Sequence, residues 1–277
     1  MNDRHDEPES STGNIADVPQ EVLDGIVRNQ LGQFSVGLLG VKNEGGQPSL
    51  QLCGSGTLVS AGGAHFILTA AHVWWKKLRY FDHLALTLKE RDFHEFLIRS
   101  SFISAHALSP AEDEMWGPDL CFLRIPPSCI GTIEAYRTFY NLSMRREFAL
   151  EHEVDPGAGL WVLMGIPETE SVFTNTQADL KFFGAIFTIE DVHQRANWDY
   201  LDLGINLSKN PPSSFGGMSG GGLWQIDIER YEDKDGTLLW RPGAALEGVA
   251  FYQSKPANGR RFIRCHGRRS LYLNVPA

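Results

Sequence analysis

Positive charge, cysteine and long hydrophobic runs are all scarce in this sequence of 277 residues. Lysine and arginine number 25 against 34 aspartates and glutamates, and the net charge of −9 argues against a nucleic-acid partner, whose phosphates would need neutralising. No apolar run approaches the length of a transmembrane helix, so no membrane partner is expected. The four cysteines form no CxxC pair, and neither a metal site nor a cofactor is indicated.

The first residues of the chain lack the apolar core that a secretory signal needs. Residues 1–16 are polar and acidic, and we expect them to form a disordered tail. Between Pro19 and Asn29, apolar residues recur at helical spacing. This spacing predicts an amphipathic helix that docks on the protein core.

Short apolar runs separated by turn residues dominate the rest of the chain and predict strands. The expected strands lie at 33–41, 57–60, 65–69, 84–88, 96–98, 120–125, 159–167, 178–188, 200–206, 223–229 and 247–252. Residues 128–153 break this pattern and are expected to be partly helical. We interpret them as a linker between two β-rich halves, with a partner-docking element as the alternative.

Three short motifs carry side chains that together could perform nucleophilic catalysis. His72 ends the run TAAH, Asp119 is the centre of PDL, and Ser219 lies in the glycine-rich run FGGMSGGG. A serine hydroxyl is a poor nucleophile unless a neighbouring base accepts its proton and a third group orients that base. An imidazole can be that base because it titrates near neutrality. In the order His, Asp, Ser, the three motifs resemble those of the trypsin-like serine peptidases.

The resemblance implies an all-β fold of two packed, six-stranded, antiparallel Greek-key β-barrels with the site in the cleft between them. Residues 17–127 would form the N-terminal helix and the first barrel, with His72 and Asp119. Residues 128–157 would be the inter-barrel linker, and residues 158–277 the second barrel, with Ser219.

The resemblance also implies a role for each motif residue. Ser219 would attack the scissile carbonyl, His72 would accept and later return a proton, and Asp119 would orient His72. The backbone N–H groups of Gly217 and Ser219 would form the oxyanion hole, which requires a tight turn that glycine permits.

Substrate preference is expected to depend on two positions near the predicted pocket. Ser213 falls where trypsin-like members carry an aspartate for lysine or arginine, and Gln253 replaces a glycine that keeps the pocket open. A small or apolar residue before the scissile bond is therefore predicted. The expected substrate-binding residues are Ser213, Ser214, Ala250, Phe251, Tyr252 and Gln253.

Two departures from the family pattern bear on activation and location. Met218 stands where digestive and clotting relatives have an aspartate that pairs with a new N-terminal ammonium, so activation by that route is not expected. Val73 stands where extracellular relatives carry a cysteine, which would leave Cys53 without its expected disulfide partner. We therefore predict a reduced, cytoplasmic protein of the bacterial type. A secreted protein whose signal is missing from this sequence is the alternative.

The prediction from sequence is thus a serine endopeptidase that acts on a protein or peptide substrate. Because an unrestrained peptidase is hazardous in cytoplasm, narrow specificity or gating by a regulatory protein partner is expected. A non-catalytic binding module on the same fold is one alternative, and an esterase-like acyl hydrolase is another.

The remaining histidines and a cluster of arginines near the C-terminus are expected to have no functional role. The remaining histidines, His266 among them, show no metal-ligand spacing and are expected at the surface. The arginines of residues 260–269 are expected on a solvated strand face, rather than in a site for an acidic partner or nucleic acid.

Overall fold

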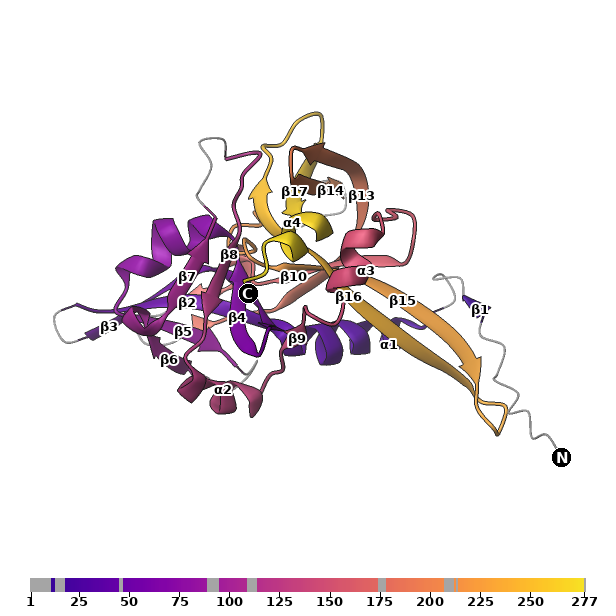
Figure 1. Cartoon of the computed structure of the whole chain (residues 1–277), viewed down its shortest axis with the longest axis horizontal. Helices are drawn as coiled ribbons and strands as arrows, with labels where there is room; N and C mark the ends of the chain where they lie inside the picture. The colour runs from indigo at the N-terminus through magenta and orange to yellow at the C-terminus, as the bar shows by residue number, and fades with distance from the viewer. Residues whose placement is uncertain are drawn as a thin grey trace.

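The computed structural model describes residues 11–12, 18–44, 47–88, 95–108, 114–173, 178–206, 212 and 214–276. Most strands within these ranges belong to two curled antiparallel sheets (Figure 1). The predicted all-β, two-barrel fold is confirmed. Ser213 and residues 1–10 and 13–16 of the predicted tail lie outside the described residues.

The first sheet closes into a ring because its two edge strands are consecutive parts of one stretch of the chain, residues 95–107. Its strands are β2 (Ser35–Glu44), β3 (Gln47–Ala61), β4 (Ala64–Thr69), β5 (His83–Thr87), β6 (Glu95–Arg99), β7 (Ser104–Ala107) and β8 (Cys121–Arg124), with β9 (Tyr140–Asn141) parallel to β3. The 3₁₀ turn Ser100–Phe102 separates β6 from β7. Since β6 pairs with β5 and β7 pairs with β8, these two strands act as one interrupted strand of a six-stranded ring.

The second sheet forms a ring through pairing of β15 with both β10 and β16. Its strands are β10 (Leu160–Gly165), β13 (Phe183–Arg195), β14 (Trp198–Asn206), β15 (Gly222–Glu232), β16 (Leu238–Gln253) and β17 (Arg260–His266). In both rings, the fourth strand along the chain pairs with the first, and the sixth pairs with the third. This shared order is the Greek-key connection predicted for both barrels.

One cluster of buried apolar residues is shared by both barrels, because several strands are buried on both faces. Successive side chains of a strand point to opposite faces. In β4, Ile67 packs inside the first barrel, whereas Phe66 and Leu68 pack between the barrels. In β10, Leu163 packs inside the second barrel, whereas Val162 joins the inter-barrel cluster. This explains why these strands read as unbroken apolar runs rather than alternating ones.

Helices lie at the chain ends, in the connection between the barrels, and directly after His72, where a π-helical turn (Val73–Lys77) leads into a 3₁₀ turn (Leu78–Tyr80). The predicted N-terminal helix is present as α1 (Gln20–Gly25), continued by a π-helical turn (Ile26–Gln30) and a 3₁₀ turn (Leu31–Phe34). The connection contains α2 (Pro127–Glu134) and α3 (Arg146–Glu151), as its broken β pattern predicted. The C-terminal helix α4 (Arg268–Leu273) was not predicted.

Two elements extend beyond the sequence predictions. Strands β15 and β16 run past the barrel as a long hairpin, which projects from the body of the molecule in Figure 1. A short strand β1 (Ser11–Thr12) pairs with Glu229 and Arg230 of that hairpin. This strand lies inside the segment that was predicted to be a disordered tail.

A separate two-stranded sheet, outside both barrels, consists of β11 (Val172–Phe173) and β12 (Ala178–Asp179). No helix in the described ranges has the length and apolar character needed to span a bilayer.

Candidate active site

His72 is held at the end of β4 by a well-packed turn. Ala70 and Ala71 are fully buried, and the amide of Val73 donates to the carbonyl of Ala70 at 3.1 Å. Val73 is itself buried in the core of the first barrel. The backbone on both sides of His72 is therefore fixed, which leaves the imidazole as the group that projects from a rigid support.

Asp119 precedes β8 and accepts two hydrogen bonds from His72. Its Oδ2 lies 2.6 Å from His72 Nδ1, and its Oδ1 accepts from the His72 backbone amide at 2.8 Å. Burial raises the pKa of Asp119, but the side-chain and backbone hydrogen bonds and the charge of His72 outweigh burial and hold the pKa below its usual value. The carboxylate therefore stays ionised at neutral pH. Its bond to Nδ1 fixes the tautomer that leaves Nε2 of His72 able to accept a proton.

The loop that carries Ser219 is built on two glycines with positive φ. Gly217 has φ +89°, and a Cβ there would lie 2.4 Å from the carbonyl oxygen of Ile166. Gly220 has φ +90°, and a Cβ there would lie 2.1 Å from Thr69 Oγ1. Larger residues are excluded at both positions. The loop therefore lies directly against the end of the strand that leads to His72.

Ser55, in β3 of the first barrel, makes four hydrogen bonds, two of them to this loop. Its amide donates to the Ser219 carbonyl at 2.8 Å, and its hydroxyl donates to the Gly217 carbonyl at 2.7 Å. The hydroxyl also accepts from the amide of Ile166, and its carbonyl accepts from Thr69 Oγ1, both at 2.8 Å. Ser55 is 1% exposed. The buried hydroxyl thus connects both barrels to the backbone around Ser219.

The amides of Gly217 and Ser219 have no hydrogen-bond acceptor among the described residues. The carbonyl of each preceding peptide is nevertheless held in place. The Gly216 carbonyl accepts from Glu168 N at 2.6 Å, and the Met218 carbonyl accepts from Gly221 N at 2.8 Å. Because C=O and N–H point in opposite directions across a trans peptide, each bond fixes the direction of one free amide. The arrangement can stabilise negative charge on a carbonyl oxygen.

Met218 packs in the core of the second barrel and is 1% exposed. Its sulfur lies close to Gly165, where a Cβ would approach it to 2.9 Å. A thioether at this position fills apolar space and forms no ion pair.

The predicted pocket residues occupy different environments. Ser214 Oγ accepts from the Gly216 amide at 3.0 Å, and Ala250 bonds through its backbone to Gly220 and Gly221. Gln253 Oε1 accepts from the Phe215 amide at 2.9 Å, which ties β16 to the segment just before the Ser219 loop.

The two predicted aromatic residues of the pocket also differ from each other. Phe251 is buried, and its ring stacks on His266 at a centroid distance of 4.3 Å. Tyr252 is half-buried and packs against Phe262. The Phe251 ring therefore lies next to His266, whose Nε2 accepts from the Asp119 amide.

Two predictions about polar residues were wrong. His266 is fully buried rather than at the surface, and its Nε2 accepts from the Asp119 amide at 3.0 Å. Arg264 and Arg268 are also buried, because Arg264 binds Asp202 through two bonds of 2.7 Å and Arg268 binds Glu247. Arg264 of β17 pairs with Asp202 on the neighbouring strand β14, and Arg268 of α4 pairs with Glu247 on β16, which offsets the loss of hydration of each guanidinium.

Sequence reasoning missed the residues that support the triad motifs: Ser55, Glu168, Ile166 and His266. Alternation along β17 places His266 on the opposite face from Cys265, which lies in the second barrel's core. That alternation was the one signal available for His266. It could not reveal that this face meets Asp119.

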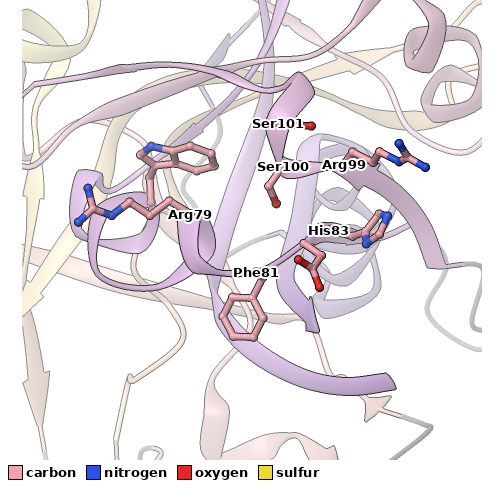
Figure 2. A pocket seen from close by; sticks show the side chains of 8 residues that line it. Arg79, Phe81, His83, Arg99, Ser100 and Ser101 are labelled. Atoms are coloured by element: carbon pink, nitrogen blue, oxygen red, sulfur yellow. The ribbon is translucent and has the colours of Figure 1, made fainter. Parts of the chain in front are cut away.

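Cavities also lie elsewhere on the molecule, and two of them have different linings. One, of about 480 Å³, is lined by Trp74, Arg79, Phe81, Asp82, His83, Arg99, Ser100 and Ser101 (Figure 2). The guanidinium groups of Arg79 and Arg99 point in opposite directions in this view, so they do not converge on one ligand. The other, of about 740 Å³, lies between the N-terminal helical segment and β13. Within the described ranges, no cluster of three or more His, Cys, Asp or Glu side chains could hold a metal ion.

No protein-family model matches this chain, and no curated protein matches its sequence. Among solved structures, a chain reported with the coupled folding and binding of the intrinsically disordered Sesbania mosaic virus VPg protein has a TM-score of 0.44 and 15% identity. The match covers 88% of this chain and 96% of that one. The scabies mite inactivated protease paralogue S-I1 has a TM-score of 0.45 and 14% identity, covering 87% of this chain and 92% of that one. At these identities, neither neighbour's activity transfers to this chain.

Proposed function

We propose that this protein is a serine endopeptidase whose nucleophile is Ser219. The observation that carries the proposal is the pair of bonds from His72 to Asp119, at 2.6 and 2.8 Å, in a turn that abuts the Ser219 loop. A carboxylate that accepts from imidazole Nδ1 prepares Nε2 to act as a general base. A buried structural His–Asp pair would not require a neighbouring serine loop with two oriented, unbonded amides.

The proposed reaction follows from these groups. Ser219 Oγ attacks the scissile carbonyl carbon as His72 Nε2 takes the hydroxyl proton. The oxyanion is stabilised by the amides of Gly217 and Ser219, and the imidazolium by Asp119. Collapse of the tetrahedral intermediate breaks the C–N bond, and His72 gives its proton to the leaving amine. Water then attacks the acyl carbonyl as His72 takes a proton from it, and His72 returns this proton to Ser219 Oγ as the ester bond breaks.

We propose further that the residue before the scissile bond is small or apolar. The support is the bond between Gln253 Oε1 and the Phe215 amide, which keeps a long polar side chain beside the serine loop. A preference for cleavage after lysine or arginine would contradict this assignment.

A reducing, cytoplasmic location is part of the same proposal. All four cysteines are free thiols, and Cys53 lies in the core of the first barrel together with Val73. Burial raises the pKa of Cys53 to about 11, so its thiol remains protonated and inert at neutral pH. A protein or peptide is the proposed substrate, and gating by a protein partner is proposed as the restraint on activity.

Labelling by a fluorophosphonate probe, followed by intact mass, tests the proposed function. Wild type should gain one probe mass, and Ser219→Ala should gain none. Ser104→Ala, which removes an exposed serine of β7, is the control and should label as wild type does. Cleavage of a peptide library by wild type, and not by Ser219→Ala, would then identify a peptidase.

Three other outcomes would count against the proposal. A folded wild-type protein that labels neither alone nor with cell lysate added as a source of the gating partner would indicate the non-catalytic binding module. Turnover of esters without peptide cleavage would indicate an acyl hydrolase. Labelling that persists in Ser219→Ala would place the nucleophile elsewhere.

A further inference from the structure

The last residue of β17, His266, contacts the backbone of Asp119, whereas the Asp119 carboxylate contacts His72. His266 Nε2 accepts a hydrogen bond from the Asp119 amide at 3.0 Å, and the His266 ring is fully buried. Asp119 is therefore hydrogen-bonded to two imidazoles. The Asp119 carboxylate orients the imidazole of His72, which belongs to the first barrel. The imidazole of His266, which belongs to the second barrel, holds the Asp119 backbone.

The bond to Asp119 requires His266 to be neutral. Burial lowers the pKa of His266 to about 3, against a weaker opposing effect from the nearby Asp119 charge. An unprotonated Nε2 can accept from the amide, whereas a protonated one would face it donor to donor. At neutral pH the ring is thus an acceptor of fixed tautomer.

Aromatic packing fixes the ring of His266 in this orientation. Its face stacks on Phe251 at 4.3 Å with an interplanar angle of 19°. Tyr200 and Trp198 contact it at centroid distances of 5.4 and 5.3 Å. The acceptor nitrogen therefore has little freedom to turn away from Asp119.

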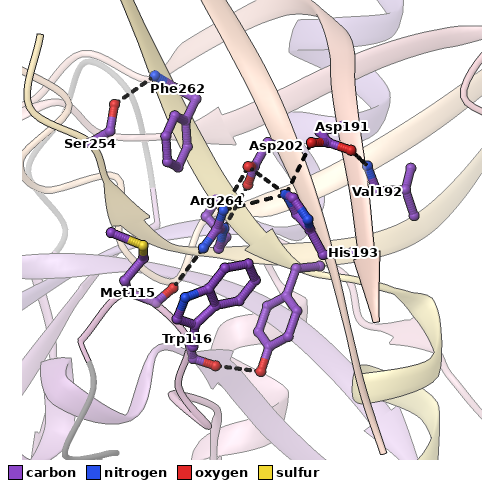
Figure 3. A network of polar contacts seen from close by, with 10 residues as sticks. Met115, Trp116, Asp191, Val192, His193, Asp202, Ser254, Phe262 and Arg264 are labelled. Atoms are coloured by element: carbon purple, nitrogen blue, oxygen red, sulfur yellow. Dashed lines mark hydrogen bonds and ion pairs between the residues drawn. The ribbon is translucent and has the colours of Figure 1, made fainter. Parts of the chain in front are cut away.

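Other side chains of the second barrel hold the loop that leads into Asp119 (Figure 3). Tyr200 donates its hydroxyl proton to the Trp116 carbonyl, and Arg264 Nη1 donates to the Met115 carbonyl at 3.2 Å. The Trp116 ring also lies against two guanidinium groups, those of Arg264 and Arg195, at 3.8 and 3.9 Å. These contacts reach the same short loop from three strands, β13, β14 and β17.

Asp202 and His193 contact the guanidinium of Arg264, which binds this loop. Asp202 binds Arg264 with both oxygens at 2.7 Å, and its Oδ2 also lies 3.0 Å from His193 Nε2. A bidentate carboxylate fixes the plane of a guanidinium. The position of the Arg264 guanidinium against the loop is therefore fixed by Asp202 and His193 of the second barrel.

Gly117 shows how closely this loop approaches His266. It has φ +66°, and a Cβ there would lie 2.8 Å from the Asp119 amide nitrogen and 3.2 Å from His266 Nε2. Any side chain would intrude on the bond itself. The local backbone is thus shaped to bring the Asp119 amide to the imidazole.

We propose that His266 is a positioning residue for Asp119, through which the second barrel sets the direction of a carboxylate that belongs to the first. The proposal rests on the proposed function, in which Asp119 orients His72. It means that the relative placement of the two barrels controls how well His72 is aligned. Displacing reacting groups by about 1 Å can slow an enzyme roughly a hundredfold.

The test compares His266→Phe, which keeps an aromatic ring and removes the acceptor, with His266→Gln, whose Oε1 can replace Nε2. His65→Phe is the matched control, since His65 is partly buried, contacts Phe139, and touches none of the three triad motif residues. Two measurements are made on each protein: the rate of fluorophosphonate labelling, and the downfield proton resonance of the His72 Nδ1–H···Asp119 bond.

We expect His266→Phe to label about 10- to 100-fold more slowly and to shift or lose the resonance. His266→Gln should recover most of both signals, and His65→Phe should match wild type. Gly117→Ala should resemble His266→Phe. The proposal is overturned if His266→Phe matches wild type in the resonance, or if the phenylalanine and glutamine variants are equally impaired.

The two measurements separate failure of this inference from failure of the proposed function. A wild-type protein that shows the resonance and labels neither alone nor with cell lysate added would refute a serine hydrolase, and the resonance would still decide the role of His266. A wild-type protein without the resonance would lack the His72–Asp119 bond that His266 is proposed to support, which would overturn the inference.

Discussion

The hydroxyl of Ser55 donates to the carbonyl of Gly217 across the junction between the two barrels, at a distance of 2.7 Å. The same oxygen accepts from the amide of Ile166 at 2.8 Å. One small side chain of β3 therefore joins the opening strand of the second barrel to the turn that carries the two unbonded amides.

Ser55→Ala should lower both stability and the labelling rate. The substitution leaves the Gly217 carbonyl and the Ile166 amide buried without partners, at a cost of about 1–3 kcal/mol for each. Urea unfolding and fluorophosphonate labelling are the measurements, with Ser104→Ala as the control. A variant as stable as wild type would mean that water replaces the hydroxyl, and unchanged labelling would show that Ser55 does not order the turn.

Gly217→Ala should abolish labelling, whereas Gly236→Ala should leave it unchanged. Both glycines have positive φ, +89° and +75°. A Cβ at Gly217 would lie 2.4 Å from the Ile166 carbonyl oxygen, but a Cβ at Gly236 meets nothing within 4 Å. Strain from φ alone costs about 1–2 kcal/mol and is common to both variants. The difference in labelling between the two variants therefore isolates the effect of the close contact between residue 217 and the Ile166 carbonyl. Equal labelling of the two would argue against an oxyanion hole at this turn.

Stability should fall as the pH drops from 7 towards 5, and His266→Gln should reduce this dependence. The pKa of His266 is lowered by burial to about 3, so below pH 6.5 the unfolded chain binds a proton that the folded chain does not. Stability therefore rises with pH in this window, by about 1.4 kcal/mol per pH unit from this group. The lowered pKa of Asp119 contributes at lower pH, near and below its usual value. Urea unfolding of both proteins at pH 7.5 and 5 measures the difference, and parallel losses would contradict it.

The sequence was informative where chemistry depends on local motifs. His72, Asp119 and Ser219 each lie where an apolar strand meets a turn, so short patterns predicted them as candidate site residues. The resemblance carried by these motifs also predicted the two-barrel fold, which the structure confirms. The supporting residues differ, since their partners are distant in sequence. Asp119 and His266 are 147 residues apart, and Ser55 and Gly217 are 162 apart. Neither pair follows from strand periodicity, which predicts which face a residue occupies and not what that face meets.

The buried arginines illustrate the same limit in another form. A cluster of like charges near the C-terminus predicts a solvated surface. The structure instead buries Arg264 and Arg268, because Asp202 and Glu247 on adjacent strands neutralise them. Composition reveals the charges, whereas the pairing depends on the register of β17 against β14 and on the packing of α4 against β16.

Asp119→Asn should leave the fold nearly intact and slow labelling roughly ten-thousandfold, if the triad mechanism holds. An asparagine fills the same space, but its amide group can donate to His72 Nδ1 and so favour the tautomer that protonates Nε2. A base already protonated at Nε2 cannot accept the Ser219 proton. Labelling rates across pH 6–9 and urea unfolding at pH 7.5 measure the two effects. A small loss of rate with full stability would show that Asp119 does not control the tautomer.

Gln253→Gly should widen the range of residues accepted before the scissile bond. Gln253 Oε1 accepts from the Phe215 amide at 2.9 Å, so its removal frees both a side-chain volume and a backbone donor beside the Ser219 loop. Bulky apolar residues such as phenylalanine should gain in kcat/KM relative to alanine, since each buried methylene is worth about 0.8 kcal/mol. Paired peptide substrates that differ at this one position measure the ratio. Gln225→Gly is the control, because Gln225 bonds to the Ala158 carbonyl, away from the serine loop. A ratio that changes equally in both variants would place the specificity pocket elsewhere.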